Sequence, residues 1–171
     1  MLTTTLSQLH QLKLSGMAKA LSQQLEQPGQ YQDLCFAERL QLLTDQEIHE
    51  RDNRKQQRLL KQAQLKLAAT AHDIDYQHPR GLQKSVMIGL LQCDWLQRQQ
   101  NLLLTGPCGT GKTYIACALA NTACLKGYTV KYYRVSRLLM ELTQAKADGT
   151  YSKKLKSLAK LNLLILDDWG L

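Results

Sequence analysis

The stretch NLLLTGPCGTGKTYIAC, residues 101–117, has glycines at 106 and 111, and the second is followed directly by Lys112 and Thr113. This spacing, G-x-x-x-x-G-K-[ST], is typical of loops that bind a nucleotide, because glycines let the main chain come close enough for several N–H groups to face the phosphates. Lys112 would contact the β- and γ-phosphates, and the Thr113 hydroxyl would bind Mg²⁺. The residues predicted to surround the nucleotide are Gly106, Pro107, Cys108, Gly109, Thr110, Gly111, Lys112 and Thr113.

The residues on either side of this loop support the prediction. The leucines at 102–104 form a short apolar run, which predicts a buried strand over 101–105. After Thr113, apolar residues recur at helical spacing as far as Ala123, so a helix would begin with its positive end at the phosphates. The alternative is a glycine-rich turn with a chance lysine, and the order strand, loop, helix argues against it.

The remainder of the chain alternates between strand and helix patterns. Residues 129–135, TVKYYRV, predict a second strand, and residues 161–166, LNLLIL, predict a third that is buried on both faces. Two helices lie between them, one capped by Ser136 and one basic, over residues 151–160. The predicted fold class is therefore α/β with a parallel sheet.

Two carboxylates, Asp167 and Asp168, follow the third strand. In an open parallel sheet, this strand end lies at the same edge as the glycine loop. Asp167 would position Mg²⁺ through its water shell, with Thr113 as the direct ligand. Asp168 would polarise the attacking water, although a glutamate is commoner in that role and reaches further. The alternative for this pair is a turn or a helix cap.

The first 70 residues carry helical patterns only. Apolar residues recur at helical spacing over 6–25, with a break at Ser15-Gly16 where Ser15 would cap a second helix. A long helix follows, capped by Asp33, and it becomes strongly basic after residue 50. We therefore divide the chain into a helical domain, residues 1–70, and a nucleotide-binding domain, residues 71–171.

The basic part of the long helix has two interpretations. Arg51, Arg54, Lys55 and Arg58 recur at helical spacing along one side, as expected for a face that contacts DNA phosphates. A helix face that is merely solvated has the same pattern. The sequence alone does not decide between the two.

The composition restricts the partners and the compartment. The 171 residues include 22 basic and 14 acidic side chains, a net charge of +8 that favours a polyanionic partner. No apolar run is long enough to span a membrane, and no signal pattern opens the chain. The five cysteines form no C-x-x-C pair, so we expect reduced thiols in a cytoplasmic protein.

Several segments together resemble the IstB-type ATP-binding helper proteins of insertion-sequence transposition, which are relatives of the DnaC helicase loader within the AAA+ ATPases. These segments are LKLSGMAKAL (12–21), FAERLQLLTDQEIHERDNR (36–54), DIDYQHPRGL (73–82), CDWLQRQQNLLLTGPCGTGKTYIACALA (93–120) and LNLLILDDWGL (161–171). The glycine loop alone would indicate only the P-loop superfamily. The helical segment and the DDWGL motif narrow the resemblance to this family.

The resemblance implies a P-loop NTPase fold of the AAA+ type that binds ATP and Mg²⁺. It also implies ATP-dependent binding of double-stranded DNA, assembly into a homo-oligomer, and delivery of target DNA to a transposase. One departure is evident, because family members continue past DDWGL. In the AAA+ strand order, the strand after that motif lies between 161–166 and 101–105. We therefore expect a sheet that is incomplete at its C-terminal end, in which 161–166 pairs with 129–135 and 101–105 lacks its neighbour.

Alternatives stay open at this point. A hydrolysis-dead remnant that binds ATP and DNA is favoured by the missing sensor and arginine-finger regions, since loss of such an arginine costs about 10³–10⁵ in rate. A DnaC-like helicase loader is a close variant of the first hypothesis. A P-loop small-molecule kinase lacks support, because no pattern indicates an acceptor site or an arginine-bearing lid. For the isolated chain we expect weak or absent ATP hydrolysis and marginal stability.

Overall fold

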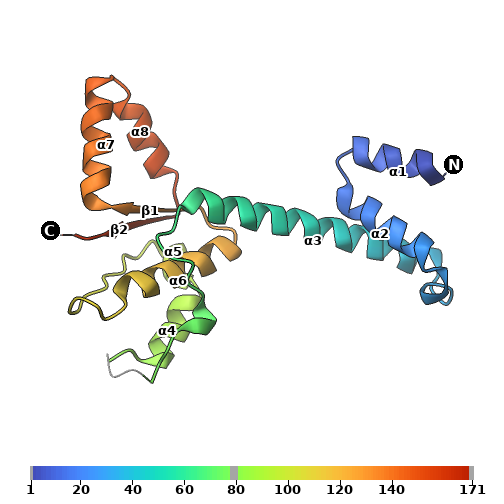
Figure 1. Ribbon diagram of the computed structural model, residues 1–171, viewed down its shortest axis with the longest axis horizontal. Coiled ribbons are helices and arrows are strands. Elements are labelled where there is room, and N and C mark those ends of the chain that lie inside the picture. Colours follow the sequence, from blue (N-terminus) through green and yellow to red (C-terminus); the bar gives the residue numbers. More distant parts are fainter. Residues whose placement is uncertain (1, 78–80, 170–171) are drawn as a thin grey trace. The chain divides into compact units, whose positions relative to one another are not determined.

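The computed structural model describes residues 2–77 and 81–169. The chain divides into two compact units, Met1–Lys55 and Gln56–Leu171, and the division falls inside helix α3, Phe36–Ala63 (Figure 1). The boundary predicted from the sequence lay further along, near Thr70. The two positions differ because the end of α3 packs into the second unit, where Leu59 and Ala63 are buried in one cluster with Val130.

The first unit consists of helices. They are α1 (Leu2–Gln11), α2 (Ser15–Glu26), a 3₁₀ turn (Pro28–Gln30) and the first part of α3. Helices α2 and α3 approach each other closely at Gly16, where an added Cβ would lie 2.7 Å from the Cα of Glu47. The Glu47 carboxylate accepts hydrogen bonds from the N–H groups of Gly16 (2.7 Å) and Met17 (3.2 Å). One buried carboxylate therefore binds the free N–H groups at the start of α2, where the helix dipole also favours a negative charge.

Three side chains predicted to cap helices, those of Ser15, Asp33 and Ser136, do not do so. Ser15 is the first residue of α2 and its side chain caps nothing, because Glu47 fills that role from another helix. Asp33 does not cap α3, which begins at Phe36 and has the N–H of Cys35 bound by the Glu38 carboxylate at 2.7 Å. Ser136 lies inside α7, which starts directly at the end of a strand and has no side-chain cap.

Glu47 keeps its charge although it is only 5% exposed. Burial on its own raises the pKa of this carboxyl group. The hydrogen bond from Arg51, the bonds from Met17 and Gly16 and the Arg51 charge together outweigh burial, so the pKa lies below its ordinary value. Because the folded-state pKa is depressed, the stabilisation is present above the unfolded pKa and is lost as pH falls through the folded value.

The second unit contains the remaining elements in a strand and helix alternation. They are the end of α3, a 3₁₀ turn (Ala71–Asp73), α4 (Lys84–Leu91), α5 (Asp94–Gln97), α6 (Lys112–Leu125), β1 (Val130–Arg134), α7 (Val135–Ala147), α8 (Tyr151–Ala159) and β2 (Leu163–Asp167). The helix predicted after the glycine loop is α6, and the basic helix predicted over 151–160 is α8. The α/β class predicted from the sequence is confirmed.

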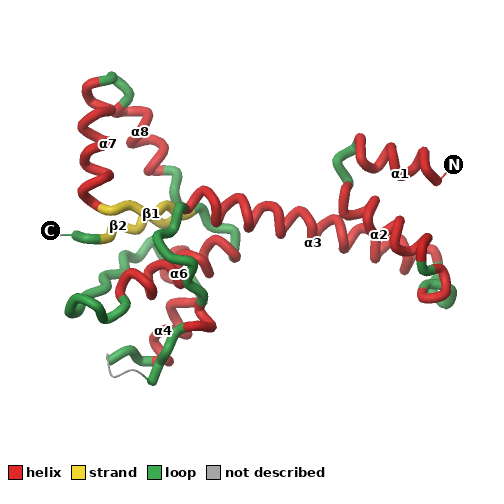
Figure 2. The backbone as a smooth tube through the Cα atoms, in the orientation of Figure 1, coloured by secondary structure: helices red, strands yellow, loops and turns green. Residues whose placement is uncertain are grey.

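The sheet of the described residues has two strands, β1 and β2, which lie side by side and parallel (Figure 2). Their register runs from Val130 opposite Leu163 to Arg134 opposite Asp167. The predicted pairing of 161–166 with 129–135 is thus confirmed. The strand predicted over 101–105 is wrong: this segment pairs with no strand among the described residues, and Leu103 is 84% exposed. An extended segment without an adjacent strand has no ladder of hydrogen bonds to form.

The core of this unit is built around α6. Buried residues occupy most of the circumference of this helix, and the small ones among them allow neighbouring elements to pack closely; they are Ile115, Cys117, Ala118, Leu119, Ala120, Ala123 and Cys124. Val130 and Tyr132 of β1 belong to the same clusters, as does Met87 of α4. Helix α6 is therefore fixed against the sheet, and this fixes the position of its first turn.

No helix in the described part of the chain is long and apolar enough to cross a membrane. Two segments used in the sequence comparison extend beyond the described residues. Residues 78–80 of DIDYQHPRGL and the final Gly170-Leu171 of DDWGL lie outside them.

The close approach of α2 and α3 at Gly16 predicts that adding a single methyl group there destabilises the fold. Gly16→Ala should lower the free energy of unfolding by about 1–3 kcal/mol, because the new methyl group would meet the backbone of Gln46 and Glu47. Gly29→Ala in the same unit is the control, since an added Cβ there has no atom within 4 Å. Urea denaturation of the full chain measures both. Equal stability of the two variants would contradict the proposed tightness of this contact.

Candidate functional site

The glycine loop has the bends that its sequence predicts. Gly109 and Gly111 adopt left-handed backbone conformations, with φ of 79° and 87°. A side chain in that region costs about 1–2 kcal/mol, so glycine is required for the shape of the loop. Gly111 immediately precedes α6, so residues 106–111 lead directly into the N-terminal end of this helix. A helix start preceded by a glycine loop is the arrangement that binds phosphate groups.

Lys112 is folded back onto this loop. Its ammonium group donates hydrogen bonds to the carbonyl oxygens of Gly106 and Pro107, each at 2.7 Å. The Thr110 hydroxyl donates to the same Pro107 oxygen at 2.9 Å. In the described part of the chain, the cation predicted to contact phosphates therefore donates its hydrogen bonds to backbone carbonyls, and a phosphate would be a far stronger partner.

Thr113 and Asp167 meet although they lie far apart in the sequence. The Thr113 hydroxyl, in the first turn of α6, donates a hydrogen bond of 2.9 Å to Oδ2 of Asp167, at the end of β2. The structure thus brings together the two residues that were assigned to magnesium. A hydroxyl and a carboxylate are both oxygen ligands of the kind that Mg²⁺ prefers.

Asp167 has two further partners for the same oxygen. The Tyr132 hydroxyl of β1 donates to Oδ2 at 2.5 Å, and the Lys66 ammonium lies 3.8 Å from it. The other carboxylate oxygen, Oδ1, accepts from the N–H of Asp168 at 3.0 Å. These donors hold the carboxylate in one orientation, toward the start of α6.

The donors also determine the charge of the site. Burial raises the pKa of Asp167, but the hydrogen bonds from Tyr132, Thr113 and the Asp168 backbone, with the Lys66 charge, lower it below its ordinary value. Burial, followed by the bond to Asp167 and its charge, raises the pKa of Tyr132. At neutral pH the carboxylate is therefore charged and the phenol keeps the proton that it donates.

These residues fit a magnesium ion that is shared with a nucleotide. Within the described ranges, no three His, Cys, Asp or Glu side chains gather to hold a metal by themselves. Mg²⁺ at phosphate-binding sites needs only one or two protein ligands, because phosphates and waters supply the others. The pair Thr113 and Asp167 satisfies that requirement.

Asp168 lies beside Arg134, at the matching ends of β2 and β1. The Arg134 Nε atom is 3.4 Å from Oδ2 of Asp168, and both side chains are well exposed. Asp168 has a left-handed backbone with φ of 57°, which directs it away from the regular strand. The predicted water-polarising carboxylate is therefore at the correct edge of the sheet and paired with a cation from the neighbouring strand.

The predicted DNA residues are exposed along α3, but they are not equivalent. Arg51 Nε lies 2.7 Å from the Glu47 carboxylate and Arg54 lies 3.7 Å from it, so one buried acid offsets part of their charge. Lys55 and Arg58 are exposed, and no ion pair involving either occurs in the described part of the chain. These positions suit a phosphate contact and also suit a solvated face, so the assignment to DNA stays a prediction.

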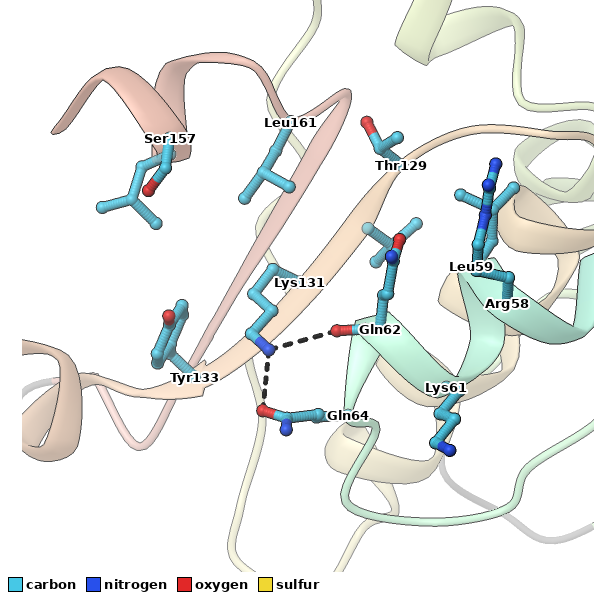
Figure 3. A pocket seen from close by; sticks show the side chains of 12 residues that line it. Arg58, Leu59, Lys61, Gln62, Gln64, Thr129, Lys131, Tyr133, Ser157 and Leu161 are labelled. Carbon is cyan, nitrogen blue, oxygen red and sulfur yellow. Dashed lines mark hydrogen bonds between the residues drawn. The ribbon is translucent and has the colours of Figure 1, made fainter. Parts of the chain in front are cut away.

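Arg58 also borders a cavity of about 630 Å³, which we call the basic cavity (Figure 3). The end of α3, β1 and α8 border it. Its cations are Arg58, Lys61 and Lys131, and the described residues that line it include no carboxylate. Lys131 donates to the carbonyl oxygen of Gln62 (3.1 Å) and to Oε1 of Gln64 (2.7 Å). Burial, together with the Lys154 charge, lowers the pKa of Lys131. No glycine-loop residue lines this cavity, so it is separate from the candidate nucleotide site.

Three residues of the site were not found from the sequence. They are Lys66, Tyr132 and Arg134. Tyr132 and Arg134 share one face of a predicted strand through their spacing of two, which was the available signal. Lys66 follows α3 in a segment with no motif, so only the fold could place it beside Asp167.

Comparisons with known proteins agree on one family. The profile described as "IstB-like ATP binding protein" matches residues 7–171. A protein described as an insertion sequence IS1162 ATP-binding protein, from Pseudomonas fluorescens, is 49% identical over 168 residues, covering 98% of this chain and 72% of that protein.

Two other relatives support the same conclusion. The insertion sequence ATP-binding protein y4pL of Sinorhizobium fredii is 41% identical over 167 residues, covering 98% of this chain and 68% of its own length. The insertion sequence IS21 ATP-binding protein of Pseudomonas aeruginosa is 31% identical over 162 residues, covering 95% of this chain and 61% of its own length.

The hydrogen bond between Tyr132 and Asp167 predicts a stability effect. Tyr132→Phe should lower the free energy of unfolding by about 1–3 kcal/mol, because a half-buried carboxylate loses a donor. Tyr133→Phe is the matched control: its hydroxyl accepts from Lys154 at 3.1 Å, and Lys154 keeps Glu141 at 2.7 Å. Thermal and urea unfolding compare the two. If Tyr133→Phe lowered the free energy of unfolding more than Tyr132→Phe, the stabilising role assigned to the hydrogen bond between Tyr132 and Asp167 would be contradicted.

Proposed function

Because the chain belongs to the family of IstB-like ATP-binding proteins, we propose that it binds ATP with Mg²⁺ at residues 106–113. We also propose that it assists insertion-sequence transposition by binding double-stranded target DNA and delivering it to a transposase. The observation that carries the nucleotide proposal is the hydrogen bond between Thr113 and Asp167. This bond joins the first turn of α6, which follows the glycine loop, to the end of β2, where Asp167 is followed by Asp168. An ATP site requires both parts: the loop for the phosphates and the carboxylates for Mg²⁺ and water.

The phosphates would bind at the N-terminal end of α6, where backbone N–H groups of the loop and the helix dipole attract anions. Lys112 would exchange the carbonyl oxygens of Gly106 and Pro107 for the β- and γ-phosphates. Thr113 would be a direct ligand of Mg²⁺, and Asp167 would orient its waters. When bound, Mg²⁺ neutralises negative charge on the phosphates.

Asp168 is the proposed group that orients and polarises the attacking water. Its carboxylate lies beside Arg134, and this ion pair limits the movement of the side chain. An aspartate reaches less far than a glutamate, so its position at the strand end is important for this role. Arg134 acts through Asp168 and is therefore a positioning residue in this proposal.

For DNA we propose phosphate contacts by Arg51, Arg54, Lys55 and Arg58 of α3. The exposure of all four side chains and the net charge of +8 support this proposal. Such contacts carry no sequence information, which is consistent with a protein that accepts many target sites. A transposase is the proposed partner protein, and a homo-oligomer is the proposed working form. The cytoplasm is the proposed compartment, and it suits the free thiols of all five cysteines.

Replacing Lys112 tests the proposal that residues 106–113 bind ATP. Lys112→Ala should weaken ATP binding by roughly 100-fold or more, because charge-assisted bonds to the phosphates are lost. The fold should be retained, since within the described residues this ammonium donates hydrogen bonds to loop carbonyls and not to the core. Isothermal titration with ATP and Mg²⁺ measures the affinity, and Lys126→Ala, beyond the other end of α6, is the control. Unchanged affinity in Lys112→Ala would refute the assignment.

The DNA assignment is tested by its salt dependence. Replacing Arg51, Arg54, Lys55 and Arg58 with glutamine should weaken binding to all duplex sequences and flatten the slope of log K against log [salt] by roughly 0.9 per lost contact. The control replaces Arg98, Lys153, Lys156 and Lys160, which are equally exposed and remove the same charge. If both sets change the slope equally, only net charge matters and the α3 assignment fails.

A further inference from the structure

A lysine that no motif indicates lies at the proposed magnesium site. Lys66 belongs to residues 64–70, which connect α3 to the 3₁₀ turn Ala71–Asp73 and which we call the connecting segment. Its ammonium is 3.8 Å from Oδ2 of Asp167, and the two side chains are 35% and 18% exposed. The same oxygen accepts from Thr113 and Tyr132. One carboxylate oxygen therefore carries two hydrogen bonds and a neighbouring positive charge.

We propose that Lys66 is the resident counter-cation of the magnesium site, and that Mg²⁺ binds with its nucleotide only as the Lys66 ammonium withdraws from Asp167. The proposal rests on the proposed function, since it concerns the same site. The Lys66 ammonium and a divalent cation whose waters Asp167 orients would lie close together beside one carboxylate and would repel each other, because both are positive and the site is partly shielded from water. Lys66 therefore lowers the affinity of the nucleotide-loaded site for Mg²⁺.

The backbone around Lys66 is held in place, so the side chain makes this movement. Leu65 packs against both core clusters, and Ala69 is buried with its carbonyl oxygen bound by Asn121 of α6 at 2.9 Å. On the other side, the Gln64 side chain accepts from Lys131. The segment is thus anchored before and after Lys66. A lysine has a flexible four-carbon stem, which lets the charge leave while its backbone stays.

Lys66 is the cation that the structure places beside Asp167 itself. Arg134 is paired with Asp168, and Lys112 is bound to the carbonyls of the glycine loop. Each of the three cations is therefore assigned to a different group at this edge of the sheet. Removing Lys66 removes the competitor of Mg²⁺ and leaves the phosphate-binding lysine and the Asp168 pair unchanged.

The first test titrates Mg²⁺ into the full chain at a fixed, saturating concentration of the non-hydrolysable analogue AMP-PNP, starting in EDTA. The readout is the Mg²⁺ concentration at half of the thermal stabilisation. Lys66→Met keeps the apolar stem and removes the charge, and it should lower this midpoint by about three- to fivefold, which lies within the range expected for a partly exposed ion pair. Lys66→Arg retains the charge and should leave the midpoint within about twofold of the original chain.

The outcomes separate this proposal from the proposed function. If AMP-PNP stabilises the chain but Lys66→Met leaves the Mg²⁺ midpoint unchanged, the counter-cation role is refuted and the nucleotide site stands. A higher midpoint, or weaker AMP-PNP binding in EDTA, would mean that Lys66 assists the ligand, which also refutes the proposal. If the original chain binds no AMP-PNP at any Mg²⁺ concentration, the proposed function fails, and this inference fails with it.

A second measurement needs no variant and applies even if Lys66→Met fails to fold. Acetylation of lysine amines, followed by mass spectrometry, reports how accessible each ammonium group is. Adding Mg²⁺ and AMP-PNP to the original chain should increase labelling of Lys66 several-fold relative to AMP-PNP with EDTA, while labelling of Lys112 falls as it binds phosphates. Unchanged or reduced labelling of Lys66 would overturn the proposal.

Discussion

The hydrogen bond between the Thr113 hydroxyl and the Asp167 carboxylate is the contact on which the candidate site depends. It exists because two larger arrangements place its ends. The parallel pairing of β1 and β2 sets the end of β2, and the close packing of α6 against that sheet sets its own first turn. Small buried residues such as Ala118 and Ala120 make this packing possible, because a larger side chain there would separate the helix from the strands.

Much of this arrangement could be predicted from the sequence, and the reasons differ by element. Gly111 and Lys112 have strict spacing because the geometry of a phosphate loop leaves few alternatives. The paired strands follow from a β-branched and aromatic run over 129–135 and an apolar run over 161–166. The cap of α2 could not be predicted, since Glu47 reaches it from another helix and the Ser15 hydroxyl is the more obvious local acceptor. Lys66 was missed for the same reason: its role depends on a tertiary contact with no local pattern.

The segment 101–105 shows where local reasoning about strands fails. Its leucines predict a buried strand, but burial of a strand requires a neighbour that supplies hydrogen bonds and covers the side chains. Among the described residues, β2 pairs with β1 alone, and Leu103 is exposed while Leu104 is partly packed against the core. The glycine loop is therefore supported mainly from its C-terminal side, by α6. An apolar run indicates that a segment could be a buried strand, but whether it forms one depends on the strands available to pair with it.

The charges at this edge of the sheet explain how one site can both hold itself together and accept a ligand. Asp167 is balanced by Lys66, Asp168 by Arg134, and Lys112 by loop carbonyls. The two positive partners, Lys66 and Arg134, offset the negative charge of the two adjacent carboxylates. In the proposed function, stronger partners would replace two of these contacts: phosphates at Lys112, and a hydrated divalent cation at Asp167. Under this proposal, ligand binding would exchange several modest contacts for fewer strong ones, and side chains, rather than strands, would move.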